Sequence, residues 1–351
     1  MPQREGEIPK INGVDYDIIF FYRYSMKKVA ILIPSGDISV SNVEGTHHIL
    51  TEVNKALVRA GKPRLFDIHL VGPRRDSRIK NNFFSIHADV LIEDGVQFDL
   101  VIIPAMHGEM HHCLSLNRDL APWIVSQHEA GAEVASLCTG SFLLASTGLL
   151  TGKKCATHWA HINEFRKMFP HADLVDDRLL TEQDGIYTSG SAYSYLNLIL
   201  YLIEKYTDRS MAILSSKLFA IEIDRKSQSP FIMFEGQRDH DDESIKKAQE
   251  FIEANFRERI TVDQLADMLA VGRRNLERRF KKATSNTIVE YIQRVKVEAA
   301  KISLEKSQEN INEVMLNVGY TDMKAFRTTF KRIAGLSPMQ YRNKYNRAVF
   351  A

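Results

Sequence analysis

The pattern of apolar residues changes once along this chain, near residue 244. Before that point, short apolar runs such as KKVAILIP (27–34) and DLVIIPA (99–105) alternate with segments of helical spacing. Strands that alternate with helices predict a doubly wound parallel α/β sheet covered by helices, of the flavodoxin-like kind. After residue 244 we find no convincing strand, and helical spacing continues to about residue 346. Two domains of different class are therefore expected in the 351 residues.

The boundaries of these domains follow from the same pattern. We place an α/β domain at 26–228, a linker at 229–243 and an all-α domain at 244–346. The linker assignment rests on the polar, acidic run QRDHDDES. Residues 1–25 mix acids with bases and lack the basic, apolar and small-residue order of a secretory signal, so we expect a disordered extension there.

Composition limits the function classes. No run approaches the roughly 18 consecutive apolar residues of a membrane span, so no membrane partner is expected. The three cysteines, Cys113, Cys138 and Cys155, are too few and too irregular for a disulfide framework or a zinc site. We therefore expect a cytoplasmic protein that holds no metal and no cofactor.

Charge is unevenly distributed. Residues 1–240 carry 25 Lys and Arg against 29 Asp and Glu, whereas residues 271–351 carry 17 against 7. An acidic front and a basic tail region suggest a ligand-handling domain joined to one that binds a polyanion. A solvated basic face would give the same totals, so the pattern within the basic region has to decide.

An imperfect repeat occupies the basic region. LADMLAVGRRNLERRFKK (265–282) resembles VMLNVGYTDMKAFRTTFKR (314–332), with Phe280 aligned on Phe330. Each copy predicts a short helix, a tight turn and a second helix with a basic outer face, which is the arrangement of a helix-turn-helix motif whose second helix enters the major groove. The residues expected in the core are Leu265, Leu269, Leu276, Phe280, Val314, Val318, Phe326 and Phe330. The residues expected to face outward and bind DNA are Arg273, Arg274, Glu277, Arg278, Lys281, Met323, Lys324, Arg327, Thr328 and Lys331.

The second copy and the residues after it, VGYTDMKAFRTTFKRIAGLSPMQYR (318–342), resemble the AraC/XylS family of transcription regulators. The resemblance covers about 245–345 and includes the Gly-Tyr pair, the spacing of the phenylalanines and the final GLSPMQYR. It implies double-stranded DNA as a partner and RNA polymerase as a further one. One departure is Met315, where the family usually has a small alanine.

The stretch ASLCTGSFLLAS (135–146) predicts a strand that delivers Cys138 to a tight turn, followed at once by a helix. The N-terminus of a helix stabilises a thiolate, and a nearby histidine can act as a base. With CTGSFLLASTGLLTGKKCATHW (138–159), this stretch resembles the ThiJ/PfpI-like branch of the class I glutamine amidotransferase superfamily, over about 27–205. His158 falls at the position of that family's histidine.

Two parts of that family's catalytic pattern are missing. Its enzymes usually carry a glutamate in the first strand–helix loop, where this chain has Ser41, and a glycine pair after the middle strand, where it has Ala105-Met106. Without them the site lacks the acid and the fixed donors that an oxyanion needs. We interpret Cys138 as an inherited pocket wall or ligand contact, with inert packing and catalysis as the alternatives.

The two resemblances together imply a transcription regulator, in which a catalytically degenerate amidotransferase-like domain senses a small molecule and an AraC-type domain binds DNA. We expect a homodimer without enzyme activity, and the family implies effectors such as amino acids, amines or quaternary ammonium compounds. The competing hypothesis is a ThiJ/PfpI-type thiol enzyme that uses Cys138 and His158. Open α/β sheets bind ligands beyond the carboxyl ends of their strands. The residues expected to bind the effector are therefore Ser35, Gly36, His107, Cys138, Thr139, His158 and Trp159.

Overall fold

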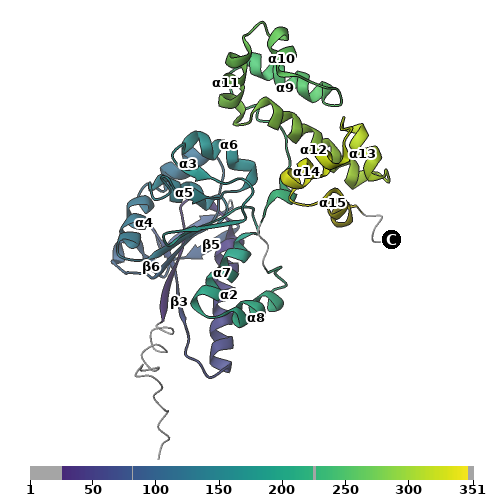
Figure 1. The fold of residues 1–351 in the computed structure, drawn as a ribbon. Helices are drawn as coiled ribbons and strands as arrows, with labels where there is room; N and C mark the ends of the chain where they lie inside the picture. The colour runs from purple at the N-terminus through teal and green to yellow at the C-terminus, as the bar shows by residue number, and fades with distance from the viewer. Residues whose placement is uncertain (1–25, 81, 224–226, 347–351) are drawn as a thin grey trace, which may run out of the picture. The chain divides into compact units, whose positions relative to one another are not determined.

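A computed structural model of the chain describes residues 26–80, 82–223 and 227–346 (Figure 1). The extension expected at 1–25 lies outside the described residues. The described residues form an α/β unit followed by a helical unit, as the change of pattern near residue 244 predicts.

The α/β unit is built on a seven-stranded sheet with the strand order β12-β13-β9-β7-β1-β3-β6. These strands are β1 (Lys27–Leu32), β3 (Phe66–Gly72), β6 (Val90–Leu91), β7 (Leu100–Ile103), β9 (Glu133–Ser136), β12 (Leu180–Gln183) and β13 (Ile186–Ser189). All neighbours in this sheet pair in parallel except β12, which is antiparallel to β13. The difference from a purely parallel sheet arises because Asp184 and Gly185, both with positive φ, join β12 to β13 as a tight hairpin.

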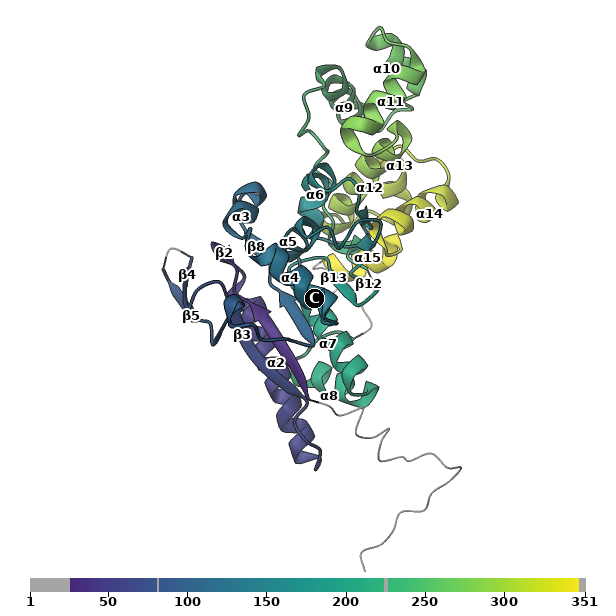
Figure 2. The ribbon, with the colours of Figure 1, turned by 90° about the vertical axis from the view of Figure 1, so that its left-hand side faces the viewer.

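Helices cover both faces of this sheet. On one face lie α2 (Val40–Arg59), α7 (Tyr195–Tyr206) and α8 (Arg209–Leu218), and on the other lie α3 (Met110–Leu116), α4 (Leu120–Glu129) and α5 (Gly140–Ser146) (Figures 1 and 2). A strand covered on both sides has no solvated face and reads as an unbroken apolar run. This explains why all four residues of β7, LVII, are buried.

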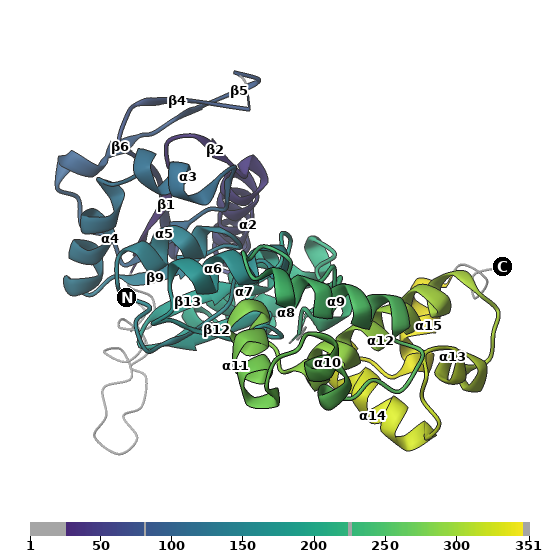
Figure 3. The ribbon, with the colours of Figure 1, turned by 90° about the horizontal axis from the view of Figure 1, so that it is seen from above.

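Several short elements lie outside the main sheet, and the sequence pattern did not predict them. They are the pairs β2 (Asp37–Ile38) with β8 (Met106–His107), β4 (Asp76–Ile79) with β5 (Phe84–His87), and β10 (Lys154–Cys155) with β11 (Asp173–Leu174), and the short helices η1 (Ile92–Asp94), η2 (Trp159–His161) and α6 (Ile162–Met168). The hairpin of β4 and β5 projects from the α/β unit (Figures 2 and 3). The antiparallel pair of β2 and β8 joins the loop after β1 to the loop after β7, at the carboxyl edge of the main sheet.

The helical unit comprises residues 159–167, 176–178 and 227 onward. After the short helix η3 (Ser229–Phe231), its described residues form α9 (Glu243–Asn255), α10 (Val262–Met268), α11 (Arg273–Thr284), α12 (Ile288–Lys306), α13 (Ile311–Asn317), α14 (Met323–Ala334) and α15 (Pro338–Tyr345). Polar side chains cap the start of most of these helices: Thr287, Asn310 and Ser337 each accept from the backbone N–H three residues later. We call α10 and α11 the first motif, and α13 and α14 the second motif.

Each motif has its own apolar core. Leu265, Leu276 and Phe280 pack with α9 and the start of α12, whereas the second motif packs against the later part of α12 and α15. Seven of the eight core residues expected from the sequence are buried. The prediction is wrong in degree for Leu269, which is half-buried against the edge of its cluster because α10 has already ended at Met268. Helix α12 therefore connects two separate cores (Figure 3).

Candidate effector site and nucleic-acid interface

The turn that follows β9 is a sharp elbow. Cys138 has a φ of 54°, a left-handed backbone that non-glycine residues rarely adopt. Helix α5 begins two residues later at Gly140, where an added Cβ would lie 2.6 Å from the carbonyl oxygen of Ile103 and 2.7 Å from that of Pro104. Only glycine allows α5 to approach the end of β7 this closely. The left-handed Cys138 between β9 and α5 forms the strand–Cys–helix elbow expected from the sequence.

The thiol of Cys138 is held in its neutral form. Its side chain is buried, with an exposed fraction of 4% for the residue, and this burial raises the pKa of the Cys138 thiol to about 11. Hydrogen bonds from Thr139 act in the opposite direction and are outweighed. A cysteine nucleophile needs a lowered pKa to be a thiolate near neutral pH. The elbow therefore has the shape of a nucleophile site without its electrostatics.

The backbone N–H and carbonyl of Ala105, in the loop beside the elbow, are already paired. The N–H of Ala105 donates to Oδ1 of Asn42 at 3.0 Å, and the carbonyl of Ala105 accepts from the N–H of Ser39 at 2.8 Å. The hydroxyl of Ser41 lies 2.9 Å from that of Ser39. An oxyanion needs free donors aimed at the place where its charge forms. Ala105, at the position of the family's first glycine, has its N–H committed to Asn42.

The loops after β1 and β7 meet where the strand order reverses. From β1 the chain proceeds to β3 on one side, and from β7 to β9 on the other, so the switch point of the sheet lies between β1 and β7. The pair of β2 and β8 joins the two loops there, with Asp37 opposite His107. This geometry brings the predicted residues Ser35, Gly36 and His107 to one edge of the sheet.

Two buried asparagines hold this edge together, and the sequence analysis did not single them out. Asn117 accepts from the N–H of Ser35 at 2.7 Å and donates to the carbonyl of Ser35 at 2.9 Å, while Asn42 holds Ala105. Ser189 also belongs to the edge, since it accepts from the N–H of Cys138 at 3.3 Å. Ser189 ends β13, beside β9, so the rule that sites gather at carboxyl strand ends could have found it. No local pattern marks the two asparagines.

The remaining predicted effector residues differ in their surroundings. Thr139 is buried, and its hydroxyl donates to the carbonyl of Met106 at 2.6 Å, which joins the elbow to the loop after β7. His158 is half-buried and ends the first of the three stretches of chain that form the α/β unit. Trp159 falls in the helical unit. Six of the seven residues thus belong to the α/β unit.

The second helix of each motif presents a basic outer face. In α11, Arg273, Arg274, Glu277, Arg278 and Lys281 are all exposed, as predicted. Arg273 lies 3.0 Å from Oδ2 of Asp263 and 3.3 Å from Oε1 of Glu277, and Lys281 donates to the carbonyl of Ser285 at 2.8 Å. The cations of the first motif are therefore partly held by other groups of the protein.

In α14, Lys324, Arg327, Thr328 and Lys331 are exposed, as predicted. Among the described residues, no ion pair joins Lys324, Arg327 or Lys331 to an acid. The prediction is wrong for Met323, which is half-buried and packs against the core of the second motif. An apolar side chain on the first turn of a helix gains more from folding back onto that core than from facing water.

The comparisons with known proteins divide the chain in the same way. The model of the DJ-1/PfpI family matches residues 28–205, and the model of a helix-turn-helix domain matches residues 265–344. The chain belongs to the DJ-1/PfpI family. It joins this domain to a helix-turn-helix domain of the AraC type, as the two resemblances predicted.

Relatives with both parts are transcriptional regulators by name. The chain is 27% identical to the HTH-type transcriptional regulator GbdR of Pseudomonas aeruginosa over 239 residues, which are 65% of this chain and 62% of GbdR. It is 25% identical to the HTH-type transcriptional regulator ArgR of the same species over 252 residues, 68% of this chain and 76% of ArgR. The match thus spans less than two thirds of the length of GbdR.

The fold resembles that of a solved structure. It is a putative transcriptional regulator protein from Vibrio parahaemolyticus, with a TM-score of 0.50 and 21% identity, and the match covers 55% of this chain and 99% of that one. In the part of this chain that the structure describes, no helix is both long and apolar enough to cross a membrane.

Proposed function

We propose that this protein is a transcription regulator that binds double-stranded DNA through both helix-turn-helix motifs. The observation that carries the proposal is the outer face of α14, where Lys324, Arg327 and Lys331 are exposed on a helix whose opposite side is buried in the core. Exposed cations on one face of a recognition helix are what phosphates and guanine edges bind. The names of the relatives and the match to a helix-turn-helix domain support the same function.

We further propose that the α/β unit binds a small effector at the switch point of its sheet, between the loop at Ser35 and the elbow at Cys138. The support is the meeting of two loops at the place where open α/β sheets take ligands. The regulator would act in the cytoplasm as a homodimer and contact RNA polymerase. An effector can change DNA binding only if it binds two states of the protein with different affinities.

We also propose that the α/β unit has no catalytic turnover. The neutral thiol of Cys138 and the occupied N–H of Ala105 support this proposal, because nucleophilic attack needs a thiolate and a prepared oxyanion site. The side chain of Cys138 is left to form part of the floor of the effector site.

DNA binding is tested with the full chain and a pool of random duplexes. We expect wild type to select a sequence, with affinity that falls steeply between about 50 and 200 mM salt because bound counterions are released. The triple variant Lys324→Ala/Arg327→Ala/Lys331→Ala should bind more weakly and lower the salt slope by about one for each phosphate that is no longer neutralised. Lys55→Ala, an exposed lysine of α2, is the control and should bind like wild type. Absence of any salt-dependent binding would contradict the proposal.

The role of Cys138 is tested by alkylation, enzyme assays and ligand screening. A neutral acid with a raised pKa loses its proton only as pH rises, so labelling of Cys138 by iodoacetamide should be slow at pH 7 and accelerate toward pH 11. Cys138→Ser should leave DNA binding without effector unchanged, and should alter any thermal shift caused by amino acids, amines or quaternary ammonium compounds. Hydrolase or glyoxalase turnover by wild type, lost in both Cys138→Ser and His158→Ala, would establish the thiol enzyme instead.

A further inference from the structure

The segment between the two domains is packed along the helical unit. Residues 229–242, which we call the strap, begin with η3 and run without regular secondary structure to Asp242, the residue that caps α9. The polar and acidic end of this segment predicts a linker at 229–243. The strap is instead packed against the helices along its length. Its first part contacts α14 and α15, its middle contacts α12, and its last part contacts α9 and α11.

The first part of the strap is fixed to the end of the second motif. Gly335, which ends α14, lies so close that an added Cβ would be 3.1 Å from Ser229 and 3.3 Å from Pro230. The hydroxyl of Tyr345 in α15 donates to the carbonyl of Pro230 at 3.2 Å. The ammonium of Lys344 lies 4.8 Å from the centre of the ring of Phe231, within reach of a cation–π interaction.

The middle of the strap is fixed to α12. The buried ammonium of Lys301 donates to the carbonyl of Ile232, and the residue has an exposed fraction of only 4%. Phe234 meets the ring of Tyr291 edge-to-face, with centres 5.1 Å apart, and the guanidinium of Arg294 lies 6.0 Å from the centre of the Phe234 ring. A buried ammonium needs acceptors for its N–H groups, and Lys301 has two: Glu298 of α12 at 2.8 Å and the carbonyl of Ile232, which joins the strap to the helix.

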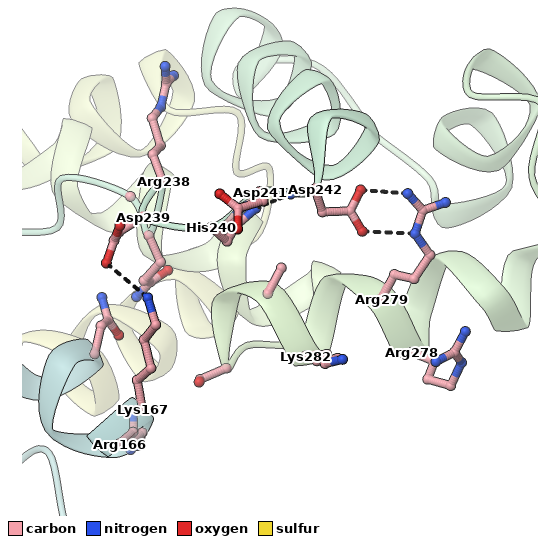
Figure 4. A pocket seen from close by; sticks show the side chains of 15 residues that line it. Arg166, Lys167, Arg238, Asp239, His240, Asp241, Asp242, Arg278, Arg279 and Lys282 are labelled. Atoms are coloured by element: carbon pink, nitrogen blue, oxygen red, sulfur yellow. Dashed lines mark hydrogen bonds and ion pairs between the residues drawn. The ribbon is translucent and has the colours of Figure 1, made fainter. Parts of the chain in front are cut away.

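The last part of the strap is fixed around the first motif. The carbonyl of Gln237 accepts from Nε2 of Gln249 in α9 at 3.0 Å, and its side-chain oxygen accepts from Nδ2 of Asn286 at 3.2 Å. Asp242 receives two hydrogen bonds from Arg279 of α11, at 2.9 and 2.5 Å (Figure 4). The Arg279 guanidinium holds the pKa of the Asp242 carboxyl below its usual range.

Two connections therefore join the two motifs. Helix α12 is the first, and it touches both cores. A helix of 19 residues curves only gently, so through α12 alone the arrangement of the motifs depends on how each core packs on its end of the helix. The strap is a second, separate connection from α14 and α15 to α9 and α11, and a second connection restricts how far either motif can shift on α12.

We propose that the strap fixes the angle and the spacing between the two helix-turn-helix motifs. Given the proposed function, on which this role in DNA recognition rests, it follows that the protein selects DNA sites in which two major-groove segments have one fixed separation. Helix-turn-helix proteins translate the distance between their recognition helices into the spacing of their sites.

The geometry can be measured without DNA. The native cysteines Cys113, Cys138 and Cys155 are buried, so spin labels can be placed on the exposed positions Gln264→Cys of α10 and Asn312→Cys of α13 in the full chain. We expect a narrow distance distribution by double electron–electron resonance in the otherwise wild-type chain. Phe234→Ala and Gln237→Ala should broaden the distribution.

A control from within the strap distinguishes this role from general disturbance. Met233, next to Phe234, is 53% exposed, and Met233→Ala should leave the distribution narrow. If Phe234→Ala does not fold, as judged by thermal melting, Gln237→Ala decides, because it removes only one side-chain hydrogen bond of the strap. A distribution that stays narrow in the folded strap variants would overturn the proposal.

The consequence for DNA is tested on the duplex that wild type selects. One or two base pairs are inserted between the two contacted segments, and the loss of affinity is compared between proteins. In strap variants we expect the ratio of affinities for the original and the lengthened duplex to be about fivefold smaller than in wild type. This factor is the lower end of the usual coupling between two binding sites. Lower stability alone would weaken binding to both duplexes equally, so an unchanged ratio would count against a role in spacing. If wild type selects no duplex, the proposed function fails, while the spin-label distances still decide whether the strap fixes the motifs.

Discussion

In the first motif Arg273 lies between Asp263 and Glu277, whereas at the aligned place in the second motif Met323 rests against the core. Glu277 itself aligns with Arg327, so one recognition helix carries an acid where the other carries a base. A cation held by protein acids has to exchange partners before it meets a phosphate, and its net gain on binding is smaller. We therefore predict that the two motifs, whose core residues align, contribute unequally to DNA binding and that the second motif supplies more of the affinity.

The turns of the two motifs differ as well. After α10, the left-handed position is taken by Ala270 with a φ of 52°, and after α13 it is taken by Gly319 with a φ of 74°. An added Cβ at Gly319 would lie 2.1 Å from the carbonyl oxygen of Arg257 and 2.8 Å from the ammonium of Lys296. The second turn is therefore packed against its neighbours so closely that only glycine fits.

The largest effect is expected at this turn. Gly319→Ala should lower the free energy of unfolding by more than about 2 kcal/mol, because the left-handed backbone alone costs a non-glycine residue about 1–2 kcal/mol and the contact with Arg257 adds to it. Gly272→Ala in the first motif is the matched control, since nothing lies within 4 Å of its added Cβ, and should cost less than about 1 kcal/mol. Urea unfolding measures both, and equal losses would erase the difference between the turns.

Next in size are the basic residues that lie early on each recognition helix. Arg274 and Lys324 align, and neither has an ion pair among the described residues. If they contact base edges, Arg274→Ala and Lys324→Ala should each cost about 1–3 kcal/mol of binding and relax one position of the selected site. Lys281→Ala, further along α11, should weaken all sequences about equally. Selection from random duplexes gives the answer, and identical selected sequences for all three variants would mean that the reading faces lie elsewhere.

A smaller effect with opposite signs is expected at the aligned pair Glu277 and Arg327. Glu277→Gln removes a negative charge from the outer face of α11 and releases Arg273 from one of its two acids, so binding should become tighter by a few-fold at low salt, as for a single surface charge. Arg327→Gln removes a cation and should weaken binding by a similar or larger factor. Titration of one duplex at two salt concentrations separates the two, and changes of the same sign would refute the division of work between the motifs.

The smallest effect is expected for Ala270→Gly. Glycine removes the strain of the left-handed backbone but makes the unfolded chain more flexible, so a net gain of about 0.5 kcal/mol in the free energy of unfolding remains. Thermal melting of wild type and variant detects this shift. Destabilisation by Ala270→Gly would show that the methyl group of Ala270 packs usefully in the first turn.

The periodic parts of this molecule could be predicted, and the parts held by distant contacts could not. The central strands of the main sheet, the elbow at Cys138 and both motifs repeat known spacings, which a sequence shows directly. Asn42 and Asn117 act through hydrogen bonds to residues more than 60 positions away, and nothing near them in the sequence indicates those partners.

The strap and Met323 show two other reasons for failure. The acids at the end of the strap suggest a solvated linker, yet Asp242 caps α9 and pairs with Arg279. Met323 aligns with Arg273, which predicts that it lies on the outer face of α14. The position of a residue on a helix sets only the direction of its Cα–Cβ bond. The long, flexible side chain of Met323 turns back and packs against the core.

The strap also decides where this protein can be cut and rejoined. A fragment that starts at residue 244, where the sequence pattern places the all-α domain, would lack Phe234 and Asp242, leaving Tyr291 without the ring of Phe234 and Arg279 without its acid. An exchange of sensor domains, in the laboratory or by recombination, would keep both motifs supported only if the junction fell before Ser229. The helical unit is therefore longer than its regular helices, and it includes a stretch of chain whose composition resembles a spacer.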